Sequence, residues 1–139
     1  MKKIIIAFTI MLLSGCSAIQ PWIDKFTIAP FDQNEYFIVN QIRTYAEITK
    51  PLCPSKYETK IYVDALYTSA FELKNYSEHL PDNKQTIPMV NLLFTMTNDL
   101  NNRYKAEGDI NKTYCELKLQ SVIDSANNIQ KAIARRPRP

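Results

Sequence analysis

Four stretches of the chain repeat apolar side chains at the spacing of an α-helix. The repeat is most regular in residues 111–134, where apolar positions advance by alternating steps of four and three. Steps of this kind keep side chains on one face of a helix, so we expect that face to pack against other helices. Pro137 and Pro139 prevent the helix from continuing. The predicted buried face consists of Cys115, Leu119, Val122, Ala126, Ile129 and Ile133.

The first helix is predicted at residues 32–49. Asp32 followed by Glu35 is the pattern of a helix N-terminus, with a capping side chain and a glutamate three positions later. Pro51 ends the helix, because the residue before a proline disfavours helical backbone angles. The predicted inward positions are Ile38, Ile42, Tyr45 and Thr49.

The second helix is predicted at residues 55–79. Ser55 and Glu58 repeat the capping pattern, and Pro81 opens a turn after the helix. The predicted inward positions are Ile61, Tyr62, Ala65, Leu66, Thr68, Ser69, Leu73, Tyr76 and Leu80.

The third helix is predicted at residues 87–105. Thr86 is the expected cap, and Pro88 lies in the first turn, where its missing N–H is harmless. Gly108 marks the break after the helix. The predicted inward positions are Met89, Leu92, Leu93, Met96, Leu100 and Tyr104.

Short links between the predicted helices determine the expected fold class. Each link has about four to six residues, which places successive helices antiparallel. The chain has only 2 glycines, too few for the tight hairpin turns of an all-β sandwich. The sequence therefore predicts an all-α fold, an antiparallel four-helix bundle. In this topology the second and fourth helices start at the same end of the bundle.

The N-terminus has the features of a secretory signal peptide. Lys2 and Lys3 precede residues 4–13, which are apolar apart from Thr9. This run is too short for a transmembrane helix, which needs about 20 residues, and it fits the apolar region of a signal peptide. Residues 1–15 are therefore predicted to be a signal peptide.

The next residues, Leu13, Ser14, Gly15 and Cys16, resemble the lipobox of bacterial lipoproteins. The resemblance implies that a lipoprotein signal peptidase recognises the first three and cuts before Cys16. It also implies that the Cys16 thiol carries a diacylglycerol thioether and that the freed amine takes a further acyl chain such as palmitate. Two or three acyl chains hold a protein durably at a membrane.

Ser17 follows the predicted lipidated residue. In enterobacterial lipoproteins, aspartate at this position favours the inner membrane, and serine is similar to proteins passed to the outer membrane. We therefore expect a lipid anchor in the outer membrane, on its periplasmic face, with inner-membrane anchoring as the lesser alternative.

The cysteine count predicts a disulfide in the body of the protein. The chain has 3 cysteines, and lipidation of Cys16 leaves Cys53 and Cys115. In an oxidising compartment such a pair forms a disulfide; two free buried thiols are the alternative. The bundle topology brings Cys53 and Cys115 to one end, although a diagonal placement of the second and fourth helices would strain the bridge. No CxxC motif is present, so no metal site is predicted.

The rest of the chain divides into a tether, residues 16–31, a helical domain, residues 32–134, and a basic tail, residues 135–139. Trp22 of the tether either rests among lipid headgroups or packs on the domain. The tail, with three arginines, is expected to be extended and disordered, and contact with anionic lipid or an acidic partner is the alternative.

Charge and motifs exclude several classes of function. The formal net charge of +3 falls to +1 without the signal peptide, and the body without the tail arginines carries −2. A nucleic-acid-binding domain needs a basic face, so we expect no nucleic-acid partner. No catalytic or nucleotide-binding motif is present, and the single histidine, His79, is expected to be structural or solvated. We predict no enzyme activity, no metal and no cofactor.

The eight tyrosines cannot all lie in so small a core, and exposed tyrosine is favoured at protein interfaces. The alternative is that they border the core. The predicted function is a membrane-anchored periplasmic interaction module that binds a periplasmic or outer-membrane protein. In layout the chain resembles the helical pilotins of type II secretins, lipoproteins with a four-helix body and one disulfide. The resemblance assigns no binding residue.

Two other functions are alternatives. The first is a phage- or plasmid-encoded envelope lipoprotein acting in superinfection exclusion or lysis, which the Lys-, Asn- and Ile-rich composition favours. The second is an enzyme acting on peptidoglycan, which requires a carboxylate in a cleft. Paired carboxylates such as Glu58 and Asp64 are more typical of solvated helix faces.

Overall fold

The computed structural model describes residues 28–106 and 110–138. The elements are helix α3, Gln33–Thr49; the short 3₁₀ helix η1, Lys50–Leu52; and helices α4, Lys56–His79, α5, Ile87–Lys105, and α6, Lys112–Ala134. This described part contains no strand. The predicted all-helical fold is confirmed, with four α-helices at the expected places along the described chain. None of these helices is both long and apolar enough to cross a membrane.

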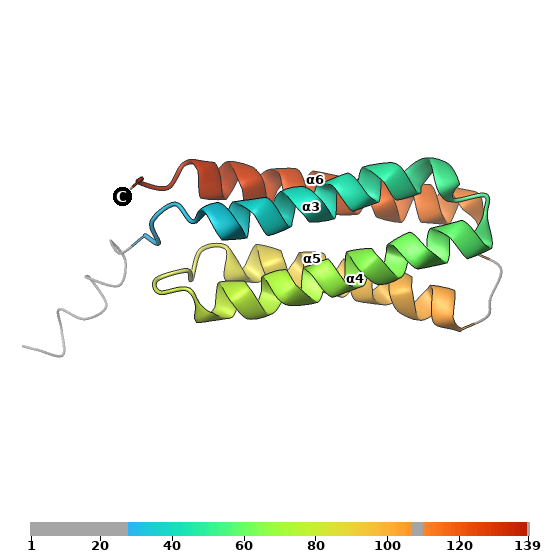
Figure 1. The fold of residues 1–139 in the computed structure, drawn as a ribbon, viewed down its shortest axis with the longest axis horizontal. Coiled ribbons are helices and arrows are strands. Elements are labelled where there is room, and N and C mark those ends of the chain that lie inside the picture. The colour runs from blue at the N-terminus through green and yellow to red at the C-terminus, as the bar shows by residue number, and fades with distance from the viewer. Residues whose placement is uncertain (1–27, 107–109, 139) are drawn as a thin grey trace, which may run out of the picture.

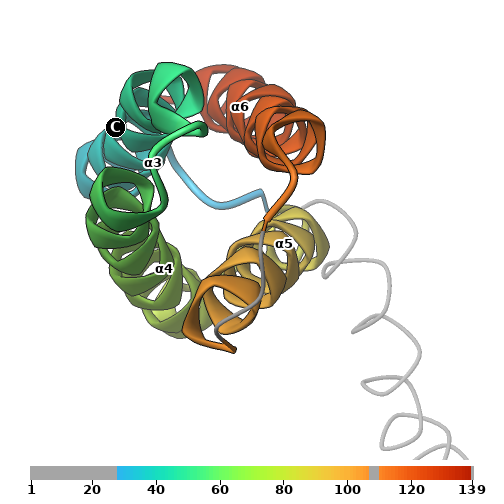
Figure 2. The same ribbon diagram turned by 90° about the vertical axis from the view of Figure 1, so that its right-hand side faces the viewer.

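The helices lie side by side, and each runs opposite to the one before it (Figure 1). Seen from the end, they form a ring in the order α3, α4, α5, α6, with α6 returning to pack against α3 (Figure 2). Helices α3 and α5 are therefore diagonal, as are α4 and α6.

The two ends of the bundle hold different segments of the chain. The terminal end holds residues 28–32, the turn at residues 80–86 and residues 135–138, so both ends of the described chain meet there (Figure 1). The disulfide end holds η1 and the start of α6.

The core lies between all four helices. Every position predicted for the inner face of α6 is fully buried, from Cys115 to Ile133, because alternating three- and four-residue steps follow the helix closely. The other central side chains come from α3, α4 and α5. They include Val39, Ile42, Val63, Leu66, Leu73, Leu93 and Leu100.

The predicted inner face of α5 is displaced to one side of the observed one. Leu93 and Leu100 are fully buried, but Leu92 is 58% exposed, and Val90 and Thr97 take the central line instead. Apolar residues surround this helix at its start, so periodicity alone does not select the stripe. Packing against α4 and α6 selects it.

The same error occurs in α4. Ile61, predicted to face inward, is 55% exposed, whereas Val63 and Ala70 are buried. The observed stripe includes two small polar residues, Thr59 and Ser77, which the search for apolar positions overlooked.

The disulfide between Cys53 and Cys115 is present, with 5.8 Å between the two Cα atoms. The expected strain from a diagonal arrangement does not arise, because Cys53 lies outside α4. It follows η1, and η1 packs against α6 as well as α3. The link between α3 and α4 thus brings Cys53 across to the first turn of α6.

All three predicted cap residues occupy the N-cap position of their helix, and one of them makes a side-chain cap hydrogen bond. The Asp32 side chain accepts a hydrogen bond of 2.7 Å from the Glu35 backbone N–H, as predicted. Ser55 and Thr86 occupy the N-cap positions of α4 and α5, as predicted, but neither makes a side-chain cap hydrogen bond. The Thr86 hydroxyl is engaged elsewhere, with the side chains of Glu35 and Asn83. Pro88 does lie in the first turn of α5, as predicted.

Candidate functional site

The residues predicted to direct lipidation lie outside the described residues. They are Leu13, Ser14, Gly15, Cys16 and Ser17. Trp22 and Gly108 also lie outside. Within the described part, the features with functional potential are an open groove on α4, an aromatic cluster beside it and a buried polar network at the terminal end.

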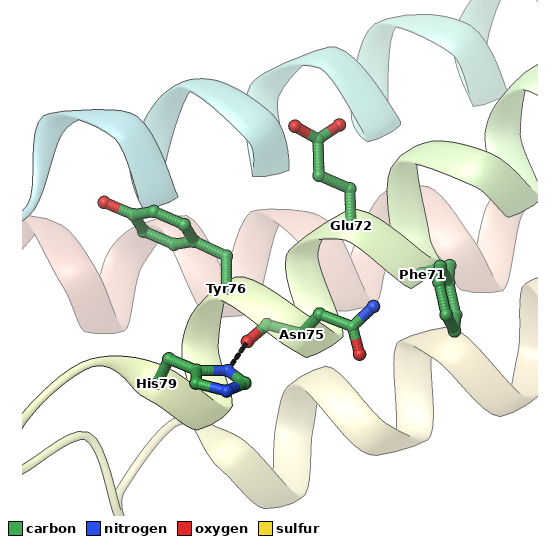
Figure 3. A pocket seen from close by; sticks show the side chains of 5 residues that line it. All are labelled: Phe71, Glu72, Asn75, Tyr76 and His79. Carbon is green, nitrogen blue, oxygen red and sulfur yellow. Dashed lines mark hydrogen bonds between the residues drawn. The ribbon is translucent and has the colours of Figure 1, made fainter.

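The α4 groove has a volume of about 520 Å³ and is lined by one stretch of one helix. Its lining residues are Phe71, Glu72, Asn75, Tyr76 and His79. The last four follow helical spacing, so they share the outer face of α4 in its last two turns. Figure 3 shows Tyr76 on the side of α4 that faces α3, and Phe71 on the side that faces α5.

Two polar side chains of the α4 groove, Tyr76 and His79, form hydrogen bonds within the protein. The Tyr76 hydroxyl lies 3.1 Å from both carboxylate oxygens of Asp32, which joins the groove to the start of α3. Burial raises the pKa of Tyr76, and the neighbouring Asp32 carboxylate raises it further, so the hydroxyl stays protonated. Nδ1 of His79 lies 2.7 Å from the carbonyl oxygen of Asn75. His79 is exposed, in agreement with the expectation of a solvated histidine.

An aromatic cluster of Tyr67, Phe71 and Phe94 adjoins the groove and bridges α4 and α5. Ring centroids are 5.9 Å apart for Tyr67 and Phe94, and 6.0 Å apart for Phe71 and Phe94. The ammonium groups of Lys74 and Lys105 lie 5.9 Å and 5.5 Å from the Phe94 and Tyr67 rings. Phe71 belongs to both features and is 47% exposed. Groove and cluster together form a surface suited to the apolar and aromatic side chains of a partner.

The buried polar network centres on an ion pair between Glu35 and Arg136. Nη1 of Arg136 lies 2.6 Å from Oε2 of Glu35, and the two side chains are 3% and 0% exposed. The other carboxylate oxygen, Oε1, accepts hydrogen bonds of 2.9 Å from Ser77 and from Asn83, and one of 3.3 Å from Thr86. Arg136 also donates to Asn83 and Thr86. The network includes residues of α3 and α4 and residues that directly precede α5 and follow α6. It therefore connects all four helices at the terminal end.

The network corrects two predictions. The Glu35 carboxylate was expected to cap the first helix, but it points into the protein. Residues 135–139 were expected to form a disordered tail, and this is wrong for Arg136, which is 6% exposed. The Phe31 N–H donates a hydrogen bond of 2.8 Å to the Pro137 carbonyl oxygen. The Arg138 guanidinium lies 5.6 Å from the Phe31 ring centroid.

A signal for the network was present in the sequence. Glu35 precedes Ile38 by three residues and Val39 by four, so it shares the inner face of α3. A carboxylate on a core face requires a buried partner. Arg136, just beyond the last helix, is such a partner.

The tyrosines divide between core and surface, and all eight belong to the described part of the chain. Tyr104 is 3% exposed, and its hydroxyl donates to Sγ of Cys115 at 3.2 Å. Tyr57 is 78% exposed, and Tyr36 is 36% exposed. The expectation that some tyrosines lie outside the core is therefore confirmed.

No group of three or more His, Cys, Asp or Glu side chains among residues 28–106 and 110–138 is arranged to hold a metal ion. Comparison with known proteins found no matching family model, no matching curated protein and no matching solved structure.

Proposed function

We propose that this chain is a lipid-anchored envelope protein whose helical body binds another protein. One observation carries the proposal: the Cys53–Cys115 disulfide leaves Cys16 as the single remaining cysteine. That cysteine directly follows a leader and the lipobox-like residues Leu13, Ser14 and Gly15. A buried disulfide also fits an oxidising compartment such as the periplasm.

The anchor is the acylated Cys16, and Ser17 after it favours the periplasmic face of the outer membrane. Growth of the producing bacterium with labelled palmitate tests this step. The wild-type chain and a Cys53→Ser/Cys115→Ser variant incorporate the label, and Cys16→Ser does not. Label in Cys16→Ser, or none in the wild type, contradicts the proposed anchor.

The binding face in this proposal is the α4 groove with its aromatic cluster. Phe71 is the central residue, because it lines the groove and contacts Phe94. Half-exposed aromatic side chains held by a rigid helix lose little conformational freedom on binding, which suits them to anchor a partner. The remaining polar groups, Glu72 and Asn75, are placed to give such a contact its direction.

A photo-crosslinking amino acid at position 71 of the full chain tests the binding face in cells. We expect one discrete adduct with an envelope protein, weakened when Cys16→Ser removes the anchor. The matched control is position 117, where Leu117 is 64% exposed on α6. No adduct at position 71, or the same adducts at both positions, contradicts the proposed face.

A further inference from the structure

We infer that the terminal end of the bundle faces the membrane and that Arg135 and Arg138 bind the phosphate groups of anionic phospholipids there. The inference rests on the proposed anchor at Cys16 and extends it, because it assigns an orientation and a lipid-binding surface to the body.

The connection to Cys16 selects the terminal end. The described chain begins at Ile28, only 12 residues after Cys16, and an extended segment of this length reaches about 40 Å at most. Helix α4 has 24 residues, so the bundle is about 36 Å long. Contact of the disulfide end with the lipid would therefore need a fully extended tether, and any less extended tether holds the terminal end nearest to the lipid.

The buried network fixes the tail arginines in place. Arg136 is locked to Glu35, and the Pro137 carbonyl oxygen accepts a hydrogen bond from Phe31. Arg135 and Arg138, on either side of this buried anchor, are exposed. Arg138 lies over the ring of Phe31, the last residue of the tether. The backbone that carries both arginines is thus fixed beside Phe31, and the Arg138 guanidinium is held over its ring.

The exposed charge around them is mainly positive. Lys131 lies one helical turn before Arg135 and is exposed. The exposed acids at this end of α4 are Glu78, which pairs with Lys74 at 2.9 Å, and Asp82 in the turn after the helix. The Asp32 carboxylate is engaged with the Glu35 N–H and the Tyr76 hydroxyl, and Arg136 is neutralised by Glu35. The disulfide end also carries exposed lysines, so charge alone does not choose between the ends; the tether does.

Guanidinium groups suit this partner because they donate two parallel hydrogen bonds to a phosphate. Each basic residue at an anionic bilayer surface strengthens binding about fivefold, and the contribution falls with added salt. The two arginines together therefore favour the docked orientation by about 25-fold.

The test uses the mature chain, Cys16–Pro139, whose core and disulfide lie within residues 29–133. With the disulfide formed, Cys16 is the single free thiol, so a maleimide lipid attaches there alone. The lipidated chain is placed on phosphatidylglycerol-containing vesicles, and a photo-crosslinker is introduced at exposed Ala134 or, at the other end, at exposed Tyr57. Lipid adducts are counted by mass spectrometry.

We expect at least about fivefold more lipid adducts at position 134 than at position 57. The excess falls at least about fivefold in Arg135→Gln/Arg138→Gln, on neutral phosphatidylcholine vesicles and at high salt, to the level that the tether alone gives. The matched control, Lys56→Gln/Lys60→Gln at the disulfide end, leaves the excess unchanged.

Equal adducts at both positions, no adducts, or an excess that loss of the arginines leaves unchanged overturns the inference. An excess of the same size on neutral vesicles also overturns it and leaves an acidic protein as the alternative partner of the tail. Because the lipid is attached chemically, these outcomes are independent of whether cells acylate Cys16, which the palmitate experiment decides.

Discussion

The buried Glu35–Arg136 pair supports a quantitative prediction about stability. Glu35→Ala removes the counter-charge of a guanidinium that is 3% exposed and leaves the donors of Ser77 and Asn83 without their carboxylate acceptor. Arg136→Ala leaves a fully buried carboxylate with hydroxyl and amide donors alone. Each single change therefore creates an unpaired buried charge, whereas the double change removes both charges.

The expected magnitudes follow from the burial of the pair. Removing one partner of a buried ion pair destabilises a protein by about 3–5 kcal/mol. For a body of this size, that lowers the melting temperature by roughly 15–25 °C. Glu35→Ala/Arg136→Ala removes both charges, so its loss is expected to stay well below the sum of the two single losses, with a coupling energy of about 2 kcal/mol or more.

Urea unfolding followed by far-UV circular dichroism, with the disulfide intact, measures these free energies. Arg138→Ala is the matched control, because Arg138 is exposed and two residues away; its effect should stay within about 0.5 kcal/mol. Deletion of residues 135–139 should reproduce the loss seen in Arg136→Ala. Single losses below about 1 kcal/mol, or additive effects in the double variant, would refute the assigned role of the pair.

Three further predictions concern the core and the disulfide. Replacing Cys53 and Cys115 by alanine should lower the free energy of unfolding by about 4 kcal/mol, because the 62-residue loop is released in the unfolded chain; a loss under about 1 kcal/mol in urea unfolding would contradict this. Leu93→Ala should lower the free energy of unfolding by about 2–5 kcal/mol, and Leu92→Ala by under about 0.5 kcal/mol. Equal losses in the two variants, measured by thermal unfolding, would contradict the buried face assigned to α5. Burial raises the pKa of Tyr104, so the contribution of its protonated hydroxyl to stability is complete below about pH 10 and declines as the pH rises through the folded-state pKa. Urea unfolding between about pH 9 and 11 should therefore show a smaller loss of unfolding free energy with rising pH in Tyr104→Phe than in the wild type. Identical pH profiles for the two proteins would exclude this role.

The helices and the disulfide were predictable from the sequence because their signals are local. Prolines end three of the predicted helices or follow them closely, and the α6 stripe repeats for six positions without interruption. The cysteine pairing followed from the predicted export to an oxidising compartment and from the predicted topology. The diagonal placement of α4 and α6 does not prevent the bridge, because η1 brings Cys53 across to α6, and η1 has no signal in the apolar pattern.

The terminal end was predicted poorly because its order depends on contacts between residues far apart. Glu35 and Arg136 are separated by 101 positions, and each has a local interpretation, as a helix-capping glutamate and as part of a basic tail. The local interpretations fail because the core face of α3 carries the glutamate inward. Any charged residue on a predicted apolar stripe is therefore a reason to search the chain for its counter-ion.

The α4 groove was not predicted from the sequence. The excess of tyrosine indicated a surface with aromatic side chains, but the sequence did not select Phe71 as the residue joining the groove to the aromatic cluster. That position depends on the rotation of α4 about its axis. The small buried residues Thr59, Ala70 and Ser77 determine this rotation, and apolar periodicity gives them little weight.

Intact-mass measurement of the mature protein, purified from the membranes of the producing bacterium, tests the central claim most directly. The proposed function predicts a chain that begins at Cys16 and carries a diacylglyceryl thioether with a further acyl chain on its amine. After proteolysis, Cys53 and Cys115 should be recovered in one disulfide-linked pair of peptides. A mature chain in which the Cys16 thiol is free, or one that still carries residues 1–15, would contradict the claim.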